Sequence, residues 1–73
     1  MLARYEIRVA HPLDETVAAA FEGFQVTGQG EFTVVSGEFD QAALHGTLER
    51  IRMLALELVD ARRVRGTTKR VGN

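Results

Sequence analysis

Cysteine is absent from this chain of 73 residues, and serine and histidine are scarce. Without cysteine there is neither a disulfide nor a cysteine-based metal site. The single serine, Ser36, falls in a predicted strand beside Gly37, and not in the strand–turn–helix elbow of a nucleophilic serine. The two histidines, His11 and His45, have no helical or hairpin spacing that would pair them as metal ligands. We therefore predict no catalytic residue, no cofactor-binding residue and no metal ligand.

Long apolar runs are also missing. No segment approaches the roughly 18 residues that would span a bilayer. Residues 1–8 alternate charged and apolar side chains, which differs from the continuous apolar core of a secretory signal. These patterns predict a cytoplasmic protein with no membrane contact.

The short chain limits the stability that its apolar core can provide. A domain of this length buries only about 60% of the surface that its unfolded chain exposes. Apolar burial and chain entropy then come close to cancelling, and no disulfide adds stability. We therefore expect a homo-oligomer.

The charge is unevenly distributed. Residues 1–60 carry four arginines against ten acidic residues, a net charge of −6. Residues 61–73 contain no acidic residue and a net charge of +5, from Arg62, Arg63, Arg65, Lys69 and Arg70. From residue 65 onward the sequence is mostly polar and has no periodicity. We predict one domain over residues 1–64 and a flexible basic tail over residues 65–73.

The first half of the chain predicts a strand, a helix and a hairpin. Residues 4–9 alternate, with Tyr5, Ile7 and Val9 on one face, as in a half-buried strand. Residues 13–24 carry an apolar stripe at helical spacing, and carboxylates occupy its first turn. Residues 24–27 and 31–37 predict two short strands, joined by a turn at residues 28–30, where two glycines permit a tight reversal.

The second half predicts a helix and a last strand. Asp40 suits the N-cap, and Phe39 and Leu44 fit a hydrophobic staple across it. The apolar stripe of this helix comprises Leu44, Leu48, Ile51 and Ala55. Gly46 inside the helix costs about 1 kcal/mol against alanine, which close packing of the helix on the sheet would explain and chance would explain equally simply. Residues 57–63 predict the last strand.

Two strand–helix–strand halves joined by a hairpin predict an α+β fold. The expected architecture is a ferredoxin-like βαββαβ sandwich, with two helices on one face of a four-stranded antiparallel sheet. The other face must meet water or a partner. If Thr33 and Val35 face the helices, this open face carries Phe32, Val34 and Leu58 among charged side chains, and these three form the candidate oligomer interface. A slip of one residue in either of the last two strands would exchange the faces.

Several segments resemble one bacterial family. They are residues 5–9, 20–24, 40–46, 48–52 and 56–59, of which 40–46, Asp-Gln-Ala-Ala-Leu-His-Gly, is the most specific. Over residues 4–64 the chain is similar to small stand-alone proteins of high-GC bacteria, which implies a ferredoxin-like or ACT-like fold and carries over no activity. ACT domains often bind amino acids at a glycine-containing turn after the first strand. Here that turn is His11-Pro12-Leu13 and lacks glycine.

Three functions remain open from the sequence. The first is a non-enzymatic module that forms oligomers, docks on a larger protein or binds a small ligand. The second is binding of an acidic partner or nucleic acid through Arg62, Arg63, Arg65, Lys69 and Arg70, although a body with a charge of −6 disfavours nucleic acid and the RNA-recognition signature is absent. The third is a small enzyme whose site is shared between subunits.

Overall fold

The chain forms strands and helices in the order that its apolar patterns predict. The structure, a computed structural model, describes residues 2–64, so the predicted basic tail at 65–73 lies outside the described residues. The elements are β1 (Ala3–Val9), α1 (Glu15–Ala20), β2 (Gln25–Gln29), β3 (Phe32–Phe39), α2 (Gln41–Met53) and β4 (Leu58–Arg63).

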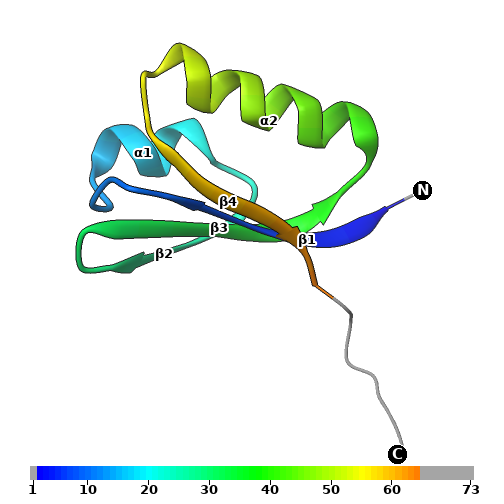
Figure 1. Ribbon diagram of the computed structural model, residues 1–73, viewed down its shortest axis with the longest axis horizontal. Helices are drawn as coiled ribbons and strands as arrows, with labels where there is room; N and C mark the ends of the chain where they lie inside the picture. The colour runs from blue at the N-terminus through cyan, green and yellow to red at the C-terminus, as the bar shows by residue number, and fades with distance from the viewer. Residues whose placement is uncertain (1, 65–73) are drawn as a thin grey trace, which may run out of the picture.

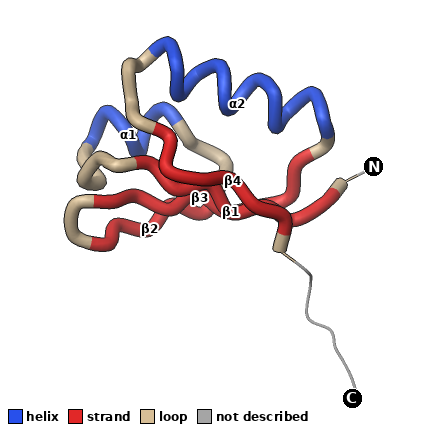
Figure 2. Tube along the Cα trace, in the orientation of Figure 1, coloured by secondary structure: helices blue, strands red, loops and turns tan. Residues whose placement is uncertain are grey.

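The four strands form one antiparallel sheet in the order β2-β3-β1-β4. Both helices lie on the same side of this sheet, and no described segment covers the opposite side (Figures 1 and 2). The α+β class, the antiparallel sheet and the placement of the two helices are therefore as predicted from the sequence.

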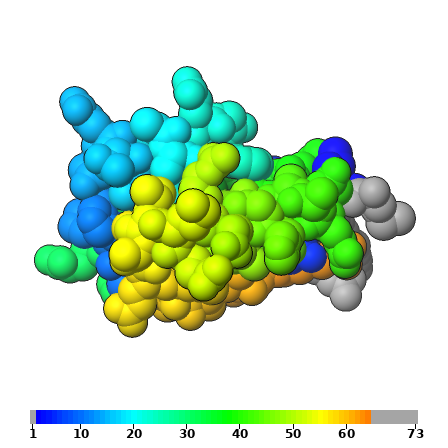
Figure 3. Space-filling view, turned by 90° about the horizontal axis from the view of Figure 1, so that it is seen from above, coloured from blue at the N-terminus to red at the C-terminus, as the bar shows by residue number. Residues whose placement is uncertain are grey.

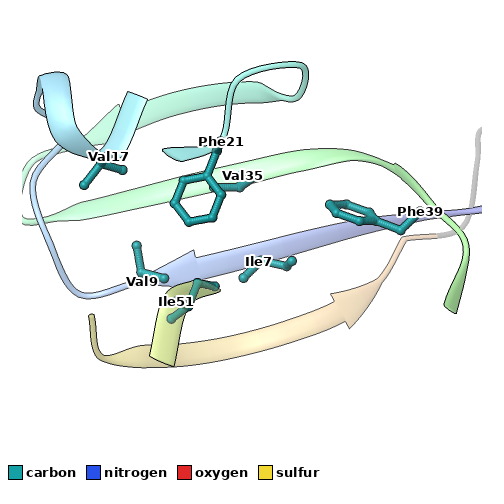
Figure 4. Packing of buried hydrophobic residues seen from close by; sticks show 7 residues of the cluster. All are labelled: Ile7, Val9, Val17, Phe21, Val35, Phe39 and Ile51. Atoms are coloured by element: carbon teal, nitrogen blue, oxygen red, sulfur yellow. The ribbon is translucent and has the colours of Figure 1, made fainter. Parts of the chain in front are cut away.

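A small apolar core lies between the helices and the sheet (Figure 4). Its seven fully buried members come from both central strands, both helices and the C-cap of α1: Ile7, Val9, Val17, Phe21, Val35, Phe39 and Ile51. Thr33 is buried as well. The inward direction of Thr33 and Val35 fixes the face assignment of β3 that the sequence left open.

Helix α1 is shorter than its apolar stripe predicts. Asp14 is its N-cap and accepts a hydrogen bond from the Val17 N–H at 2.9 Å, whereas Phe24 lies beyond the end of the helix. The chain turns at Gly23, and the Phe24 ring stacks on Phe39 with centroids 4.5 Å apart. Phe24 therefore packs on the core from the turn before β2.

The β2–β3 hairpin is tighter than predicted. Gln29 pairs with Phe32, so the loop consists of Gly30 and Glu31 alone. Gly30 has φ +61°, as the first loop position of a type II′ turn requires. Strand β3 also runs two residues further than the predicted end at Gly37.

Helix α2 begins as predicted and ends differently. The Asp40 carboxylate accepts a hydrogen bond from the Ala43 N–H at 2.7 Å. At the other end, Ala55 was expected in the helical stripe, but it lies outside the helix with φ +59°. The Ala55 N–H donates to the Arg52 carbonyl and the Leu56 N–H to the Ile51 carbonyl, which is the Schellman arrangement.

Gly46 corrects another expectation. A Cβ built on Gly46 would meet nothing within 4 Å, so close packing of helix on sheet does not account for this glycine. The residue lies on an exposed side of α2.

Strand β4 contains a bulge that moves Leu58 off the open face. Asp60 pairs with Arg8, and Leu58 pairs with Val9, so Val59 is the extra residue. Residues directly paired across a sheet project to the same face, and Val9 is in the core. Leu58 therefore lies on the helix side, and its predicted place beside Phe32 and Val34 is wrong.

Candidate functional site

The open face of the sheet carries cross-strand ion pairs between β1 and β4. The Arg8 guanidinium lies 3.6 Å from the Asp60 carboxylate, and Arg62 donates to Glu6 at 3.2 Å. All four side chains are partly exposed. Such pairs contribute little to stability, about 0–1 kcal/mol each, but they fix an ordered row of charges.

The apolar part of the open face is small. Phe32 is 39% exposed, and Val34 is half-buried. Val34 pairs with Arg8 on one side and Thr27 on the other, so polar side chains surround it. With Leu58 on the helix side, two of the three predicted interface residues remain on this face.

Four exposed apolar side chains lie close together in the sequence, where α2 leads into β4. Met53, Leu54, Leu58 and Val59, which we call the apolar corner, are all exposed, and Met53 is 78% exposed. They account for four of the seven large hydrophobic side chains that are exposed in the described residues. A contiguous patch of exposed apolar side chains indicates an interaction surface, whereas single exposed apolar residues are common on any protein.

Two shallow hollows run along α2 beside the apolar corner. One, of about 680 Å³, separates α2 from α1 and is lined mainly by apolar atoms, among them those of Ala19, Ala20 and Met53. Arg50 crosses from α2 and donates to the Ala20 carbonyl at 2.6 Å. The second, of about 400 Å³, lies between α2 and β4 and includes Leu58. Figure 3, seen from above, shows α2 and the chain that follows it along one long side of the molecule.

A third hollow, of about 500 Å³, lies at the N-terminal end of α2. Its lining includes Tyr5, Asp40 and Arg63. Because the Asp40 carboxylate already caps the first turn, a negative charge occupies the place where a helix would otherwise attract an anion.

The predicted cationic cluster is divided. Arg62 lies on the open face against Glu6, whereas Arg63 pairs with Tyr5 in the sheet and projects to the helix side. The other three predicted contacts, Arg65, Lys69 and Arg70, lie outside the described residues.

The side chains that could act as nucleophiles, acids, bases or metal ligands are dispersed over the described residues. His11 Nδ1 lies 2.8 Å from the Pro12 carbonyl and 3.9 Å from the Asp14 carboxylate. His45 lies on α2 and lines hollows that do not include His11. Ser36 lies in the middle of β3, paired with Glu6. Within residues 2–64, no group of three or more histidine, aspartate or glutamate side chains is placed to hold a metal ion.

Sequence patterns identified only part of this surface. Met53 was expected to be exposed, from its place opposite the helical stripe, and it is. Leu54 and Val59 were assigned inward or flanking positions, and their exposure was missed. The bulge at Val59 and the left-handed Ala55 reorient this segment, and neither has the glycine that usually marks such a feature.

Comparison with known proteins identifies a family. The family model described as "Domain of unknown function (DUF8691)" matches residues 4–62, a range that includes parts of every strand and both helices, and the chain belongs to this family. No curated protein and no solved structure matches the chain. In the described part of the chain, no helix has the length and apolarity needed to cross a membrane.

Proposed function

We propose that this DUF8691 domain is a non-enzymatic interaction module that associates with further copies of itself. The observation that supports this proposal is the exposure of the apolar corner, Met53, Leu54, Leu58 and Val59, in a domain whose described residues include only seven fully buried apolar ones. Burial of apolar surface contributes about 25 cal/mol per Å², so covering this corner would add stability that the small core lacks.

We also propose that the fold is the ferredoxin-like split βαβ arrangement. The element order, strand–helix–strand–strand–helix–strand, and the antiparallel order β2-β3-β1-β4 both support this assignment. In such a fold the last strand lies at an edge, so the apolar corner is accessible from the side of the molecule as well as from the helix face.

The apolar corner is a better candidate interface than the open face. On the open face, Phe32 and Val34 are bordered by charged and polar groups, several of them already paired with each other. Covering that face would desolvate these charges, which is costly unless the partner supplies new pairs. Beside the apolar corner, Glu49 and Arg52 line the hollow that includes Leu58, and they pair with each other at 2.9 Å.

The test is the mass of the chain in solution. Light scattering after size exclusion, at concentrations from about 1 to 100 μM, is expected to give a species of twice the 8.1 kDa chain mass or more. Val59→Lys should shift the chain to monomer, because it places a charge in the apolar corner. Phe32→Lys is the matched control, with similar exposure on the open face, and should leave the mass unchanged. A wild-type chain that stays monomeric at 100 μM overturns the proposal.

A further inference from the structure

Strand β4 lies at an edge of the sheet, and some of its backbone N–H and C=O groups bond to no other described strand. Within residues 2–64 it pairs with β1 on one side only, and all six of its residues are exposed. Edge strands of this kind offer a row of free N–H and C=O groups to another strand. The question is which strand fits this edge.

The direction of those free groups follows from one hydrogen bond. The Val64 N–H donates to the Arg4 carbonyl of β1 at 2.8 Å. Backbone groups alternate in direction along a strand, so Arg62 also turns its backbone groups toward β1. Ala61 and Arg63 then turn theirs away from the sheet, toward solvent.

The charges of β4 are arranged so that the strand complements itself. On the open face, Asp60 carries a negative charge and Arg62, two residues further, a positive one. When a second β4 runs antiparallel to the first with Ala61 opposite Ala61, each Asp60 lies opposite an Arg62. Centring the pair on Asp60 or on Arg62 instead would oppose like charges.

We propose that a second copy of this chain docks along β4, antiparallel, with the two-fold axis at Ala61. The Ala61 N–H of each copy then donates to the Ala61 carbonyl of the other, because both groups already point outward. Across the shared edge, the charged side chains then follow in a row: Arg8 and Asp60 of one copy, then Arg62 and Glu6 of the other. Their signs alternate throughout this charge row. This inference rests on the proposed self-association and names its geometry.

The apolar corner fits the same arrangement. It lies at the N-terminal end of β4, so a two-fold axis at Ala61 places one corner at each end of the shared pair of strands. Each corner then meets the end of the other copy's β4. In this register Val59 lies opposite Arg63 of the other copy, whose aliphatic stem can cover it, while the hydrogen bonds and the charge row would fix the register.

Charge reversal tests the register. In Asp60→Arg, both positions carry arginine, so two such chains repel each other in this geometry. In Arg62→Asp, both positions carry aspartate, with the same result. We expect each variant alone to dimerise at least about tenfold more weakly than the wild type. Mixed in equal amounts, the two variants should form a heterodimer, because every opposed pair is then of opposite sign.

Native mass spectrometry distinguishes the heterodimer from the two homodimers, and circular dichroism reports whether each variant is folded. Glu22→Arg is the matched control for Asp60→Arg, since it makes the same change of charge on an exposed residue of the α1–β2 turn and should dimerise like the wild type. Ala61→Pro supplies a second test. Proline removes the backbone N–H of position 61, which points away from the sheet, and breaks no hydrogen bond to β1. The substitution should therefore weaken the dimer while the sheet stays intact.

The outcomes separate the two proposals. A wild-type monomer overturns both the self-association and its geometry. A wild-type dimer whose charge-reversed variants dimerise like Glu22→Arg, or whose mixture forms no heterodimer, overturns the β4 register and leaves self-association standing. Weak single variants with a strong mixed pair support the register.

Discussion

At the scale of single residues, Gly37 is required by a close contact. A Cβ on Gly37 would lie 2.9 Å from Cδ1 of Phe24, whose ring is stacked on the buried Phe39. Because the rings are packed together, Phe24 cannot move aside without opening the core. We predict that Gly37→Ala lowers the free energy of unfolding by about 1–3 kcal/mol, measured by denaturant titration. An unchanged midpoint would contradict this packing.

The same substitution at Gly46 should have the opposite sign. This glycine lies inside α2 with open space where a Cβ would be. Alanine is favoured over glycine in a helix interior by about 1 kcal/mol. Gly46→Ala is therefore expected to raise the free energy of unfolding by about that amount in the same titration. Destabilisation would mean that the space beside Gly46 is occupied in solution.

Ala55 offers a third residue-scale prediction. Its φ of +59° is a left-handed conformation that costs an L-residue roughly 1–2 kcal/mol and costs glycine little. Glycine loses part of that advantage through the greater entropy of its unfolded chain. Ala55→Gly should still stabilise the protein by about 0.5–1 kcal/mol, seen as a higher Tm. A lower Tm would argue against the Schellman geometry at the end of α2.

At the scale of elements, one hydrogen bond ties the loop after β1 to the neighbouring strand. The buried Thr33 hydroxyl of β3 donates to the His11 carbonyl at 2.7 Å. Thr33→Val keeps the shape and leaves that carbonyl without its partner. We expect a loss of about 1–2 kcal/mol in the free energy of unfolding and faster amide exchange in residues 10–14.

Thr27→Val, on the exposed face of β2, is the control for Thr33→Val. Surface substitutions of this kind usually stay within about 0.5 kcal/mol. Equal effects at the two positions would show that the threonine hydroxyl of β3 does not hold the loop.

The elements also show what the sequence could predict. Element order, the inward set Tyr5, Ile7 and Val9, and the Asp40 cap all follow from local periodicity and capping chemistry, and the structure has them. The place of Leu58 does not follow, because a bulge depends on how β4 meets β1, a strand about 50 residues earlier in the chain. The end of α2 was missed because alanine, and not glycine, takes the left-handed position.

The candidate site likewise combines residues whose place follows from the local sequence pattern with residues whose place does not. Alternation placed Phe32 and Val34 on the open face, and helical spacing placed Met53 outside the core. The apolar corner as a group arises only when α2 ends at Met53 and the bulge turns Val59 outward, which are tertiary events. A cluster whose members lie within seven residues can therefore still escape a prediction made from periodicity.

At the scale of the whole molecule, stability should depend on protein concentration. If folded chains associate and unfolded chains do not, mass action raises the Tm as concentration increases. A tenfold dilution of the wild type should lower the Tm in differential scanning calorimetry. Val59→Lys should unfold at a Tm that does not change on dilution, because it removes the association. Parallel behaviour of the two proteins would contradict a stabilising interface at the apolar corner.

The central position of β1 has a consequence for how the chain is made. β1 is the earliest strand in the chain, yet its two neighbours, β3 and β4, begin at Phe32 and Leu58. A ribosome must therefore deliver almost all of these residues before β1 has both of its partners. Contacts this distant in sequence slow folding. The edge of β1 that faces β4 therefore stays open in the nascent chain until residues 58–63 have been added, although β3 can already pair with its other edge.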